Sequence, residues 1–486
     1  MDESALCELR LLRDKAYVEG EWVGADSGAT MSVRNPASQE VLGSVPEMGR
    51  IEARRAIEAA GRALPAWRQL TGKERGRLLR QWFDLIIENA DELALILTSE
   101  QGKPLAEARS EVVSGAAFIE WFAEEARRTY GDVIPTPAKD RRIVVIKQPI
   151  GVCAAITPWN FPNTIITRKV AAALAAGCTM VVRPASSTPF SALALADLAA
   201  KAGIPAGVFS VVTGKAREIG AEFSANPIVK KLSFTGSTEV GSQLMAQGSG
   251  TIKKLALELG GNAPFILFED ADLDAAIAGA IGSKFRNAGQ ACVGANRFYI
   301  HDSVYDDFAS RLVAQVAELK VGNGKDPGVA VGPIHDEGGV KKIEEHIADA
   351  IERGATLLAG GKRHELGGTY FQPTVLGDAD QTMKVAREET FGPVAALFRF
   401  RTEEELIEAA NATEFGLASY FYSRDHARIW RVAEALEFGM VGVNTGLMAN
   451  EAVPFGGIKS SGIGREGSKY GIEDYMEIKY ICMAGL

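Results

Sequence analysis

The feature that most constrains the fold of this 486-residue chain is an alternation of short apolar runs and helix-forming stretches through its middle. The runs CTMVVRP, GVFSVVTG and KKLSFTG each follow or precede a predicted helix, over 167–176, over 188–202 and from Ala216. Strands separated by helices of this length indicate βαβ units and a parallel sheet. The pattern resumes after Glu258 with APFILF, a helix over 272–286, RFYIHD and a helix over 303–319. We therefore expect two α/β domains in series.

The segments on either side have other patterns. Residues 15–48 carry Gly, Asn and Pro around short β-type runs, which predicts an N-terminal hairpin region. Residues 51–130 have helical spacing, and Gly131 follows as a stop. The closing YMEIKYIC alternates as a strand with one buried face would. At a chain end such a strand often pairs with another subunit.

Composition excludes several classes of function. Lys and Arg total 53 against 62 Asp and Glu, a net charge of −9, whereas a nucleic-acid footprint is basic. An anionic ligand must therefore be bound by a local concentration of Arg or Lys. The longest apolar run, 170–182, is well short of the roughly 20 residues of a membrane helix. The N-terminus MDESALCELRLLRD has no apolar stretch of signal-peptide length.

The cysteines and histidines point to a reducing compartment without a metal centre. The five cysteines are scattered and form no C-x-x-C pair: Cys7, Cys153, Cys178, Cys292 and Cys482. The five histidines have no H-E-x-x-H spacing. We expect a cytoplasmic protein with no membrane span, no nucleic-acid partner and no metal.

Cys292 is the candidate nucleophile. It lies in FRNAGQACVGANR among glycines and polar residues, a context that gives a thiol access and helps it reach the thiolate. A buried structural cysteine is the commoner role of an arbitrary Cys, and Cys178 and Cys482 fit that description.

Two further polar residues are candidates for the same chemistry. Glu258 stands before Gly260 and Gly261 where the two α/β halves join, and desolvation there would raise its pKa and suit it as a general base. Asn160, on a Pro-bounded turn after a strand, has an amide that can donate to an oxyanion. Taken alone, a solvated Glu and a turn Asn are the more ordinary interpretations.

Six stretches taken together are more specific than any of these residues. They are PWNFP at 158–162, FTGSTEVG at 234–241, ELGGN at 258–262, GQAC at 289–292, EETFGP at 388–393 and PFGGIKSSGIGREGSKYG at 454–471. In wording and order the chain resembles the NAD(P)-dependent aldehyde dehydrogenase superfamily essentially end to end. Within it, ITRK at 166–169, KFRNAGQACV at 284–293 and the closing REGSKYGIEDYMEIKY are similar to the succinate-semialdehyde dehydrogenase group.

The resemblance implies a fold and a domain arrangement. It implies two Rossmann-like three-layer α/β domains, one for cofactor and one catalytic, with a small β oligomerisation element. The expected boundaries are 1–131 and 147–257 for the cofactor domain, 258–452 for the catalytic domain, and 132–146 with 470–486 for the β element. A homodimer or homotetramer is expected.

The resemblance also implies catalytic roles. Cys292 would attack the aldehyde, the Asn160 amide and the Cys292 N–H would hold the oxyanion, and a thioester intermediate would follow hydride loss. Glu258 would activate the water that hydrolyses the thioester. Lys169 matches a supporting lysine near the site.

For the cofactor, NADP and/or NAD, the resemblance implies a turn where the pyrophosphate meets a helix N-terminus, at Thr235, Gly236 and Ser237. Glu389 matches the carboxylate that holds the nicotinamide ribose. The remaining implied contacts are Thr157, Trp159, Gly260 and Phe391. Where the family usually has Lys-Pro-Ala-Glu, this chain has Arg183-Pro184-Ala185-Ser186. Ser186 removes a carboxylate that would repel a 2′-phosphate and Arg183 keeps a cation in reach, so NADP should be accepted alongside NAD.

Substrate choice is assigned by the resemblance to Arg168 and Arg286, which match arginines that clamp a distal carboxylate; surface arginines are the ordinary alternative. A serine of the group corresponds by position to Ala449. The expected reaction is oxidation of succinate semialdehyde to succinate, with glutarate semialdehyde or 3-sulfolactaldehyde as alternative substrates. A cofactor-free Cys hydrolase or acyltransferase, pairing Cys292 with a histidine, is the alternative from another class.

Overall fold

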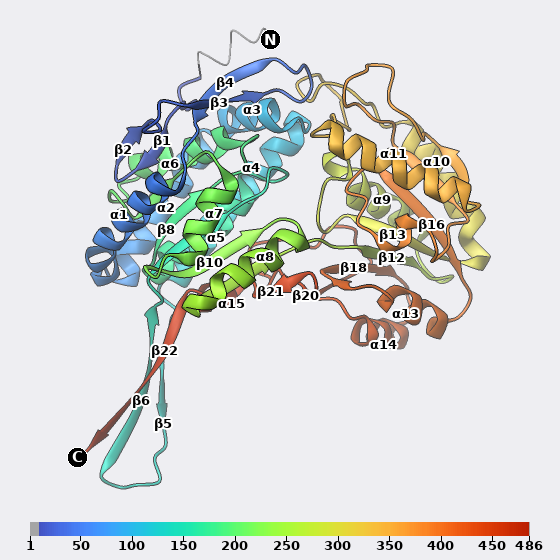
Figure 1. Cartoon of the computed structure of the whole chain (residues 1–486). Helices are drawn as coiled ribbons and strands as arrows, with labels where there is room; N and C mark the ends of the chain where they lie inside the picture. Colours follow the sequence, from blue (N-terminus) through green and yellow to red (C-terminus); the bar gives the residue numbers. More distant parts are fainter. Residues whose placement is uncertain (1–8, 486) are drawn as a thin grey trace.

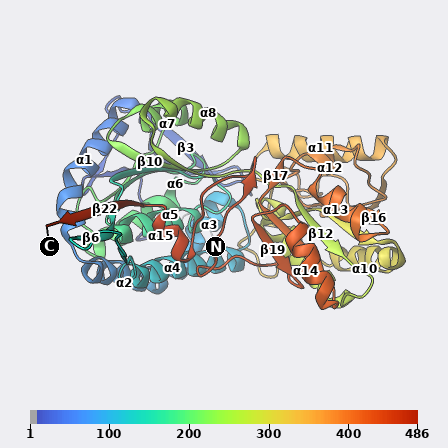
Figure 2. The ribbon, with the colours of Figure 1, turned by 90° about the horizontal axis from the view of Figure 1, so that it is seen from below.

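The structure is a computed structural model that describes residues 9–485, so Cys7 and most of the N-terminal segment considered above lie outside the described part. Two α/β halves lie side by side, and a thin β arm projects from the first of them (Figures 1 and 2). The sequence prediction of two mainly parallel α/β domains with a small β element is confirmed.

The first half is built on an eight-stranded sheet in the order β2-β1-β9-β8-β7-β10-β11-β21. Strands β9, β8, β7, β10 and β11 run parallel, whereas β1, β2 and β21 join antiparallel. The bounds are β1 Ala16–Val18, β2 Glu21–Val23, β7 Val152–Ile156, β8 Thr179–Arg183, β9 Phe209–Val211, β10 Val229–Thr235, β11 Lys254–Glu258 and β21 Gly462–Ile463.

Helices cover both faces of this sheet because alternate strand residues are apolar on both sides. Val152, Ala154 and Ile156 face one core, and Cys153 and Ala155 face the other. The first core includes α1 Arg50–Gln69, α7 Ala216–Ala225 and α8 Thr238–Gly248. The second includes α2 Gly72–Glu88, α3 Ala90–Gln101, α4 Leu105–Glu125, α5 Thr164–Ala176 and α6 Pro189–Lys201.

The second half has a seven-stranded sheet in the order β14-β15-β16-β13-β12-β18-β19, parallel except for the edge pair β14–β15. Its strands are β12 Ala263–Leu267, β13 Ala295–His301, β14 Thr356–Ala359, β15 Thr374–Gly377, β16 Val394–Phe400, β18 Ala418–Tyr422 and β19 Met440–Val443. Its helices are α9 Leu273–Lys284, α10 Tyr305–Ala317, α11 Glu337–Glu352, α12 Lys384–Arg387, α13 Glu403–Asn411 and α14 His426–Ala435.

The arm is a three-stranded antiparallel sheet of β5 Asp132–Ile134, β6 Arg141–Pro149 and β22 Met476–Ala484. Between the arm and the body, helix α15 Ser468–Glu473 packs against α4 and α5. Smaller elements complete the chain: β3 Thr30–Arg34, β4 Val41–Pro46, β17 Phe415–Gly416, β20 Ile458–Lys459, and the 3-10 turns η2 Ser249–Thr251, η3 Arg286–Gly289 and η4 Asp302–Val304.

Several local predictions are confirmed with shifted bounds. The N-terminal hairpins are β1–β2 and β3–β4. Helix α5 begins three residues before the predicted Thr167 and ends, as predicted, at Gly177, whose φ of 97° is the left-handed conformation that glycine adopts freely. Helix α10 begins after the short turn η4, two residues later than predicted.

Two local predictions were wrong. The helix expected over 272–286 stops at Lys284 because Asn287 and Ala288 take left-handed φ values of 52° and 54°, which places Arg286 in η3. The last strand has no face buried by residues 9–485: only Met476 is buried, because β22 pairs with β6 beyond the globular body. Cys482, expected to be structural, is therefore exposed, whereas Cys178 is buried as expected.

Candidate active site

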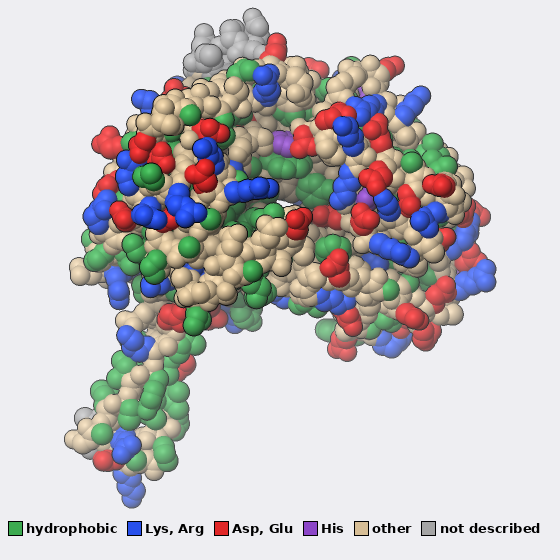
Figure 3. Space-filling view, in the orientation of Figure 1, with side chains coloured by type: hydrophobic (Ala, Val, Ile, Leu, Met, Phe, Trp, Pro, Cys, Tyr) green, Lys and Arg blue, Asp and Glu red, His purple; other side chains and the backbone are tan. Residues whose placement is uncertain are grey.

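A pocket of about 340 Å³ lies between the two halves, at the carboxyl ends of parallel strands. Figure 3 shows the corresponding hollow in the molecular surface. Ten of the residues selected from the sequence line it: Trp159, Asn160, Thr235, Gly236, Ser237, Glu258, Gly260, Cys292, Glu389 and Phe391. Residues far apart in the chain therefore meet here because strands β7, β10 and β11 all end at this edge of the sheet.

Cys292 stands in the loop between η3 and β13, half-buried at the wall of the pocket. Burial, with a smaller contribution from the negative charge of Glu389, raises the pKa of the Cys292 thiol to about 12. In this arrangement the thiol holds its proton at neutral pH. Its reactivity thus depends on a base that takes the proton as the substrate binds.

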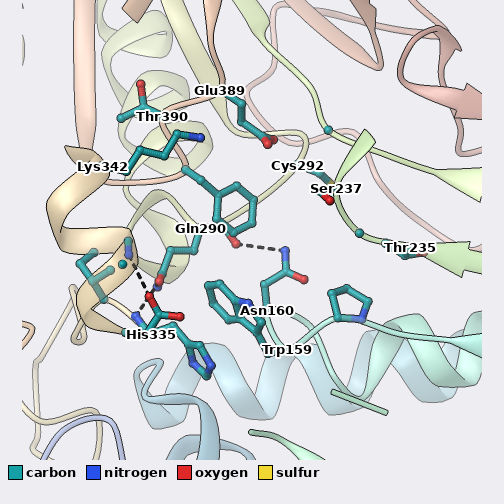
Figure 4. A pocket seen from close by; sticks show the side chains of 18 of the residues that line it. Trp159, Asn160, Thr235, Ser237, Gln290, Cys292, His335, Lys342, Glu389 and Thr390 are labelled. Atoms are coloured by element: carbon teal, nitrogen blue, oxygen red, sulfur yellow. Dashed lines mark hydrogen bonds between the residues drawn. The ribbon is translucent and has the colours of Figure 1, made fainter. Parts of the chain in front are cut away.

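Asn160 is held with its carboxamide facing the Cys292 loop (Figure 4). Its Nδ2 donates to the Gln290 carbonyl at 3.2 Å, and its Oδ1 accepts from the Phe161 N–H at 3.1 Å. The side chain is buried, at 4% exposure. The second bond fixes which end of the amide points toward Cys292, so an N–H donor faces the pocket.

Glu258, the last residue of β11, is buried at the pocket wall, and its Oε2 has no hydrogen-bond partner. Burial raises the pKa of Glu258 well above its usual range, the negative Glu466 raises it further, and Lys169 and Arg168 act in the opposite direction. A carboxylate with a raised pKa and a free oxygen is suited to accept a proton from thiol or water.

Behind Glu258 lies a buried ion cluster centred on Glu466, a residue to which the sequence assigned no role. The Lys169 ammonium, fully buried, pairs with Glu466 Oε1 and donates to Ser233 Oγ at 2.8 Å. Arg168 Nε lies 2.9 Å from Glu466 Oε2. Glu466 stands within the REGSKYG stretch, so its place in that motif was the one available signal.

The two arginines selected for the substrate lie outside the pocket lining. The Arg168 guanidinium stacks 4.2 Å from the Phe455 ring centre, and that of Arg286 lies 5.2 Å from the Phe161 ring centre. Arg168 is paired with Glu466, whereas Arg286 forms no ion pair within residues 9–485. Arg286 is therefore the cation with the more available charge.

At the adenosine end of the expected cofactor path, polar side chains are already held in place by hydrogen bonds within the protein. Arg183, at the end of β8, donates to Ser186 Oγ at 2.6 Å and to the Gly214 carbonyl at 3.0 Å. Burial lowers the pKa of Arg183 to about 10, so it keeps its charge at neutral pH. Buried polar atoms without partners remain at Thr157 Oγ1, Thr235 Oγ1 and Arg183 Nε.

The residues present fit a dinucleotide. Ser237 caps helix α8, its Oγ accepting from Val240 N at 3.4 Å, so the helix N-terminus opens beside Thr235 and Gly236. Unsatisfied buried groups along this path indicate a polar ligand. At the other end Glu389 accepts from Gly261 N at 3.1 Å, and burial raises its pKa to about 7.

Sequence reasoning missed the part of the lining that comes from 334–342, including His335 and Lys342. The His335 ring stacks on Trp159, with centroids 4.0 Å apart, and its Nε2 lies 2.8 Å from Ser187 Oγ. Burial lowers the pKa of His335 to about 4, which keeps the ring neutral. Trp159 also meets Phe391 edge-on at 5.7 Å. No motif pointed to His335, because it lies in sequence far from the stretches that carry the resemblance.

The histidine arrangement bears on the hydrolase alternative. Among the described residues no hydrogen bond joins a histidine to Cys292, and the pocket histidine is engaged by Ser187 and Trp159. A Cys–His pair of the kind a thiol hydrolase uses is thus not formed in this geometry. Also within 9–485, no group of three or more His, Cys, Asp or Glu side chains is placed to hold a metal ion, and no helix is long and apolar enough to cross a membrane.

Comparisons with known proteins identify the family of the chain. Residues 22–481 match the model of the family described as "Aldehyde dehydrogenase family". Curated relatives include a glutarate-semialdehyde dehydrogenase of Pseudomonas aeruginosa, 64% identical over 481 residues, covering 99% of this chain and 100% of the relative. The NADP(+) succinate-semialdehyde dehydrogenase of Escherichia coli is 62% identical (98% and 99% covered), and a 3-sulfolactaldehyde dehydrogenase of Pseudomonas putida 61% (98% and 98%).

Solved structures are equally similar. A succinate-semialdehyde dehydrogenase from Burkholderia pseudomallei superposes with a TM-score of 0.97 at 64% identity, covering 98% of each chain. A betaine aldehyde dehydrogenase from Staphylococcus aureus in complex with NAD+ superposes at 0.96 with 36% identity, covering 99% of this chain and 97% of the other.

Proposed function

Since the chain belongs to the aldehyde dehydrogenase family, we propose that it oxidises a short aldehyde with a distal anion, succinate semialdehyde foremost, to the corresponding acid. The expectations from the sequence that the chain belongs to this family and is an NAD(P)-dependent oxidoreductase are confirmed by the comparisons. The observation that carries the proposal is the meeting of Cys292, Asn160 and Glu258 at one pocket. Two arginines lie outside its lining, Arg286 against Phe161 and Arg168 against Phe455.

The proposed chemistry begins at Cys292. Its thiolate adds to the carbonyl carbon, a C–S bond forms, and the carbonyl π electrons move to oxygen. The Asn160 Nδ2 and the Cys292 main-chain N–H hold that oxyanion. The thiol proton passes to Glu258, which lines the same pocket and has a raised pKa. When bound, the nicotinamide ring supplies the acceptor for the hydride that leaves the former carbonyl carbon.

The second half of the reaction releases the acid. Collapse of the oxyanion with loss of the hydride leaves a thioester on Cys292. Glu258 releases the thiol proton to solvent, and as a carboxylate again it takes a proton from water so that the hydroxide adds to the thioester carbonyl. The same two donors stabilise the second oxyanion, the C–S bond breaks, and the acid leaves. Lys169 and Glu466 set the charge around Glu258 throughout.

The cofactor path supports a proposal for NADP. Thr157, Arg183 and Ser186 would lie at the adenosine end, with Thr235, Gly236 and Ser237 at the pyrophosphate and Glu389 at the nicotinamide ribose. Arg183 is already oriented by its bond to Ser186, and Ser186 brings no negative charge. A charged donor beside a neutral hydroxyl favours a 2′-phosphate over bare hydroxyls, so NADP is used alongside NAD.

The distal anion distinguishes the candidate substrates. Arg286 and Arg168 suit a carboxylate or a sulfonate, because a planar guanidinium offers several donors to either. Relatives of similar identity are named for glutarate semialdehyde and 3-sulfolactaldehyde. Ala449, in an exposed loop, offers no hydroxyl to the anion. The C4 carboxylate remains the foremost candidate, with those two aldehydes as alternatives.

The test compares kcat/KM for succinate semialdehyde, glutarate semialdehyde, 3-sulfolactaldehyde and neutral butanal. The rate is measured as the formation of reduced cofactor. We expect the three anionic aldehydes to exceed butanal by at least about 100-fold, which corresponds to the roughly 3 kcal/mol of one good charge-assisted hydrogen bond. Equal values for butanal and the anionic aldehydes would contradict the proposal.

The arm supports a homodimer or homotetramer. It exposes an unusual number of apolar side chains, among them Val133 at 76%, Ile478 at 73% and Tyr480 at 62% (Figure 3). Apolar strands left without a covering layer favour association. Replacing Ile478 and Tyr480 by Asp should give monomers in sedimentation; an unchanged oligomer would exclude the arm. The described cysteines are free thiols, which suits a reducing cytoplasm.

A further inference from the structure

The main-chain carbonyl of Asn160 accepts hydrogen bonds from both halves of the molecule. Lys103 Nζ, from the loop between α3 and α4, donates to it at 2.8 Å. Asn287 Nδ2, from η3 of the second half, donates to it at 3.1 Å. All three residues are almost fully buried, at 4% exposure or less. The residue that offers the oxyanion donor is thus fixed through its backbone carbonyl.

Asn287 uses every polar group it has. Its N–H donates to Glu107 Oε2 at 2.8 Å, its Oδ1 accepts from Gln101 Nε2 at 2.9 Å, and its Nδ2 also donates to the Gln290 carbonyl at 3.1 Å. Its backbone is left-handed, with φ of 52°. One side chain therefore fixes two carbonyls, that of Asn160 and that of Gln290, to which the Asn160 amide itself donates.

Lys103 holds the same turn from the other side. Its ammonium pairs with Glu111 Oε2, both side chains at 3% exposure or less. Glu111 Oε1 accepts from the backbone N–H groups of Asn163 at 2.9 Å and Thr164 at 3.2 Å. The pair thus restrains the turn at Asn160 and again at the start of α5. A buried network in which each member is satisfied is rigid, since any displacement leaves a buried group unpaired.

We propose that Asn287 and Lys103 are positioning residues for the oxyanion site: they hold the Asn160 amide at the place where negative charge develops beside Cys292. The proposal rests on the oxyanion role proposed above for Asn160. Stabilisation of an oxyanion depends on donors that are already in place, and a displacement of about 1 Å costs on the order of 100-fold in rate. The network supplies that fixed placement across the boundary between the two halves.

The test variant is Asn287→Gly, because glycine takes the left-handed backbone without strain and only the amide is lost. We expect hydride transfer in a single turnover to slow by about 10- to 100-fold. Alkylation of Cys292 by iodoacetamide forms no oxyanion and should change by less than about twofold, as should the Kd for NADP. Alkylation is followed on the Cys292 peptide by mass spectrometry, because Cys482 is also exposed.

Asn444→Gly is the matched control. Asn444 also has a left-handed φ, 54°, and its amide also bonds backbone groups on both sides, those of Ser423. It lies on the surface at the end of β19. Its loss should leave hydride transfer at the rate of the unmodified enzyme.

A double-mutant cycle separates positioning from support of the fold. Because Asn287 acts through Asn160, Asn160→Ala with Asn287→Gly should be no slower than Asn160→Ala alone; independent effects would multiply instead. If Asn287→Gly misfolds, the double variant Lys103→Met with Glu111→Gln, in which both buried charges are removed, replaces it in the cycle. Combined with Asn160→Ala, it should again be no slower than Asn160→Ala alone.

The opposing results are distinct. The positioning role alone would be overturned if Asn160→Ala slowed hydride transfer and Asn287→Gly did not. It would also be overturned if Asn287→Gly slowed alkylation and hydride transfer equally. Unaltered hydride transfer in Asn160→Ala would overturn the oxyanion role of Asn160, and the positioning role with it.

Discussion

Arg168 and Glu466 form an ion pair of 2.9 Å in which both side chains are only 7% exposed. Lys169 binds the other oxygen of the same carboxylate. A substrate anion that reaches Arg168 thus meets a cation that already has a buried partner, whereas Arg286 has no ion-pair partner in the part of the chain described. The two arginines should therefore respond differently to mutation.

Arg286→Ala should raise KM for succinate semialdehyde by about 10- to 100-fold and leave butanal within about threefold, because only the first substrate loses a charge-assisted hydrogen bond. Steady-state kinetics with both aldehydes checks this. Equal increases for both aldehydes would refute an anion-binding role.

Arg168→Ala should in addition lower the free energy of unfolding by about 1–3 kcal/mol, because Glu466 loses one of its two buried cations. Urea denaturation of both arginine variants measures the difference, with Arg286→Ala as the matched control. Equal stability of the two variants would show that the Arg168–Glu466 pair contributes nothing.

Ser186→Glu should raise KM for NADP by at least about 10-fold and change KM for NAD little, because a carboxylate there repels a 2′-phosphate and accepts from ribose hydroxyls. The neutral Ser186→Gln has nearly the same size and should retain NADP. The prediction fails if both substitutions weaken NADP equally, since the effect would then be steric.

Glu258→Gln should slow hydrolysis of the thioester by about 100-fold or more, because loss of a general base costs about 10²- to 10⁴-fold. The first turnover of reduced cofactor should slow less, because the thiol, unlike the attacking water, can also lose its proton to solvent hydroxide. Rapid mixing resolves the burst from the steady state. A steady-state rate equal to that of the unmodified enzyme would remove Glu258 from the mechanism.

Glu466→Gln should extend activity to lower pH. The charge of Glu466 raises the pKa of Glu258, so its removal lowers that pKa. The ionised base is populated above its pKa, and the acid limb of the kcat profile therefore moves to lower pH. Glu473→Gln, at a surface pair with Lys147, should leave the limb in place. A shift to higher pH would contradict the assigned sign.

The sequence predicted the parallel α/β architecture because strand and helix periods differ along the chain. It selected ten of the twenty residues that line the pocket, because the resemblance supplied fixed positions. Glu466 and Asn287 show where that reasoning stops. Both stand inside quoted stretches, yet their roles depend on partners far away in sequence, Lys169 for the first and Gln101 with Asn160 for the second. The spacing of residues within one stretch does not indicate partners that are distant in the sequence.

The last strand shows a different limit. The alternation in YMEIKYIC correctly predicts a β-strand, but none of the described residues covers the face that would be buried. A hydrophobic period of two indicates that one face of a strand is covered, but it does not identify the segment or subunit that covers it. No local sequence pattern indicated a role for His335. It stacks on Trp159 only because the two halves pack against each other in the folded chain.

The central claim is that the aldehyde becomes an acyl group on Cys292, and the mass of that residue tests it most directly. Glu258→Gln is mixed with NADP and succinate semialdehyde, quenched in acid after one turnover, digested and measured by mass spectrometry. The account predicts a succinyl group on the peptide that contains Cys292, in an amount equal to the reduced cofactor formed. Reduced cofactor without any adduct on that peptide would contradict it.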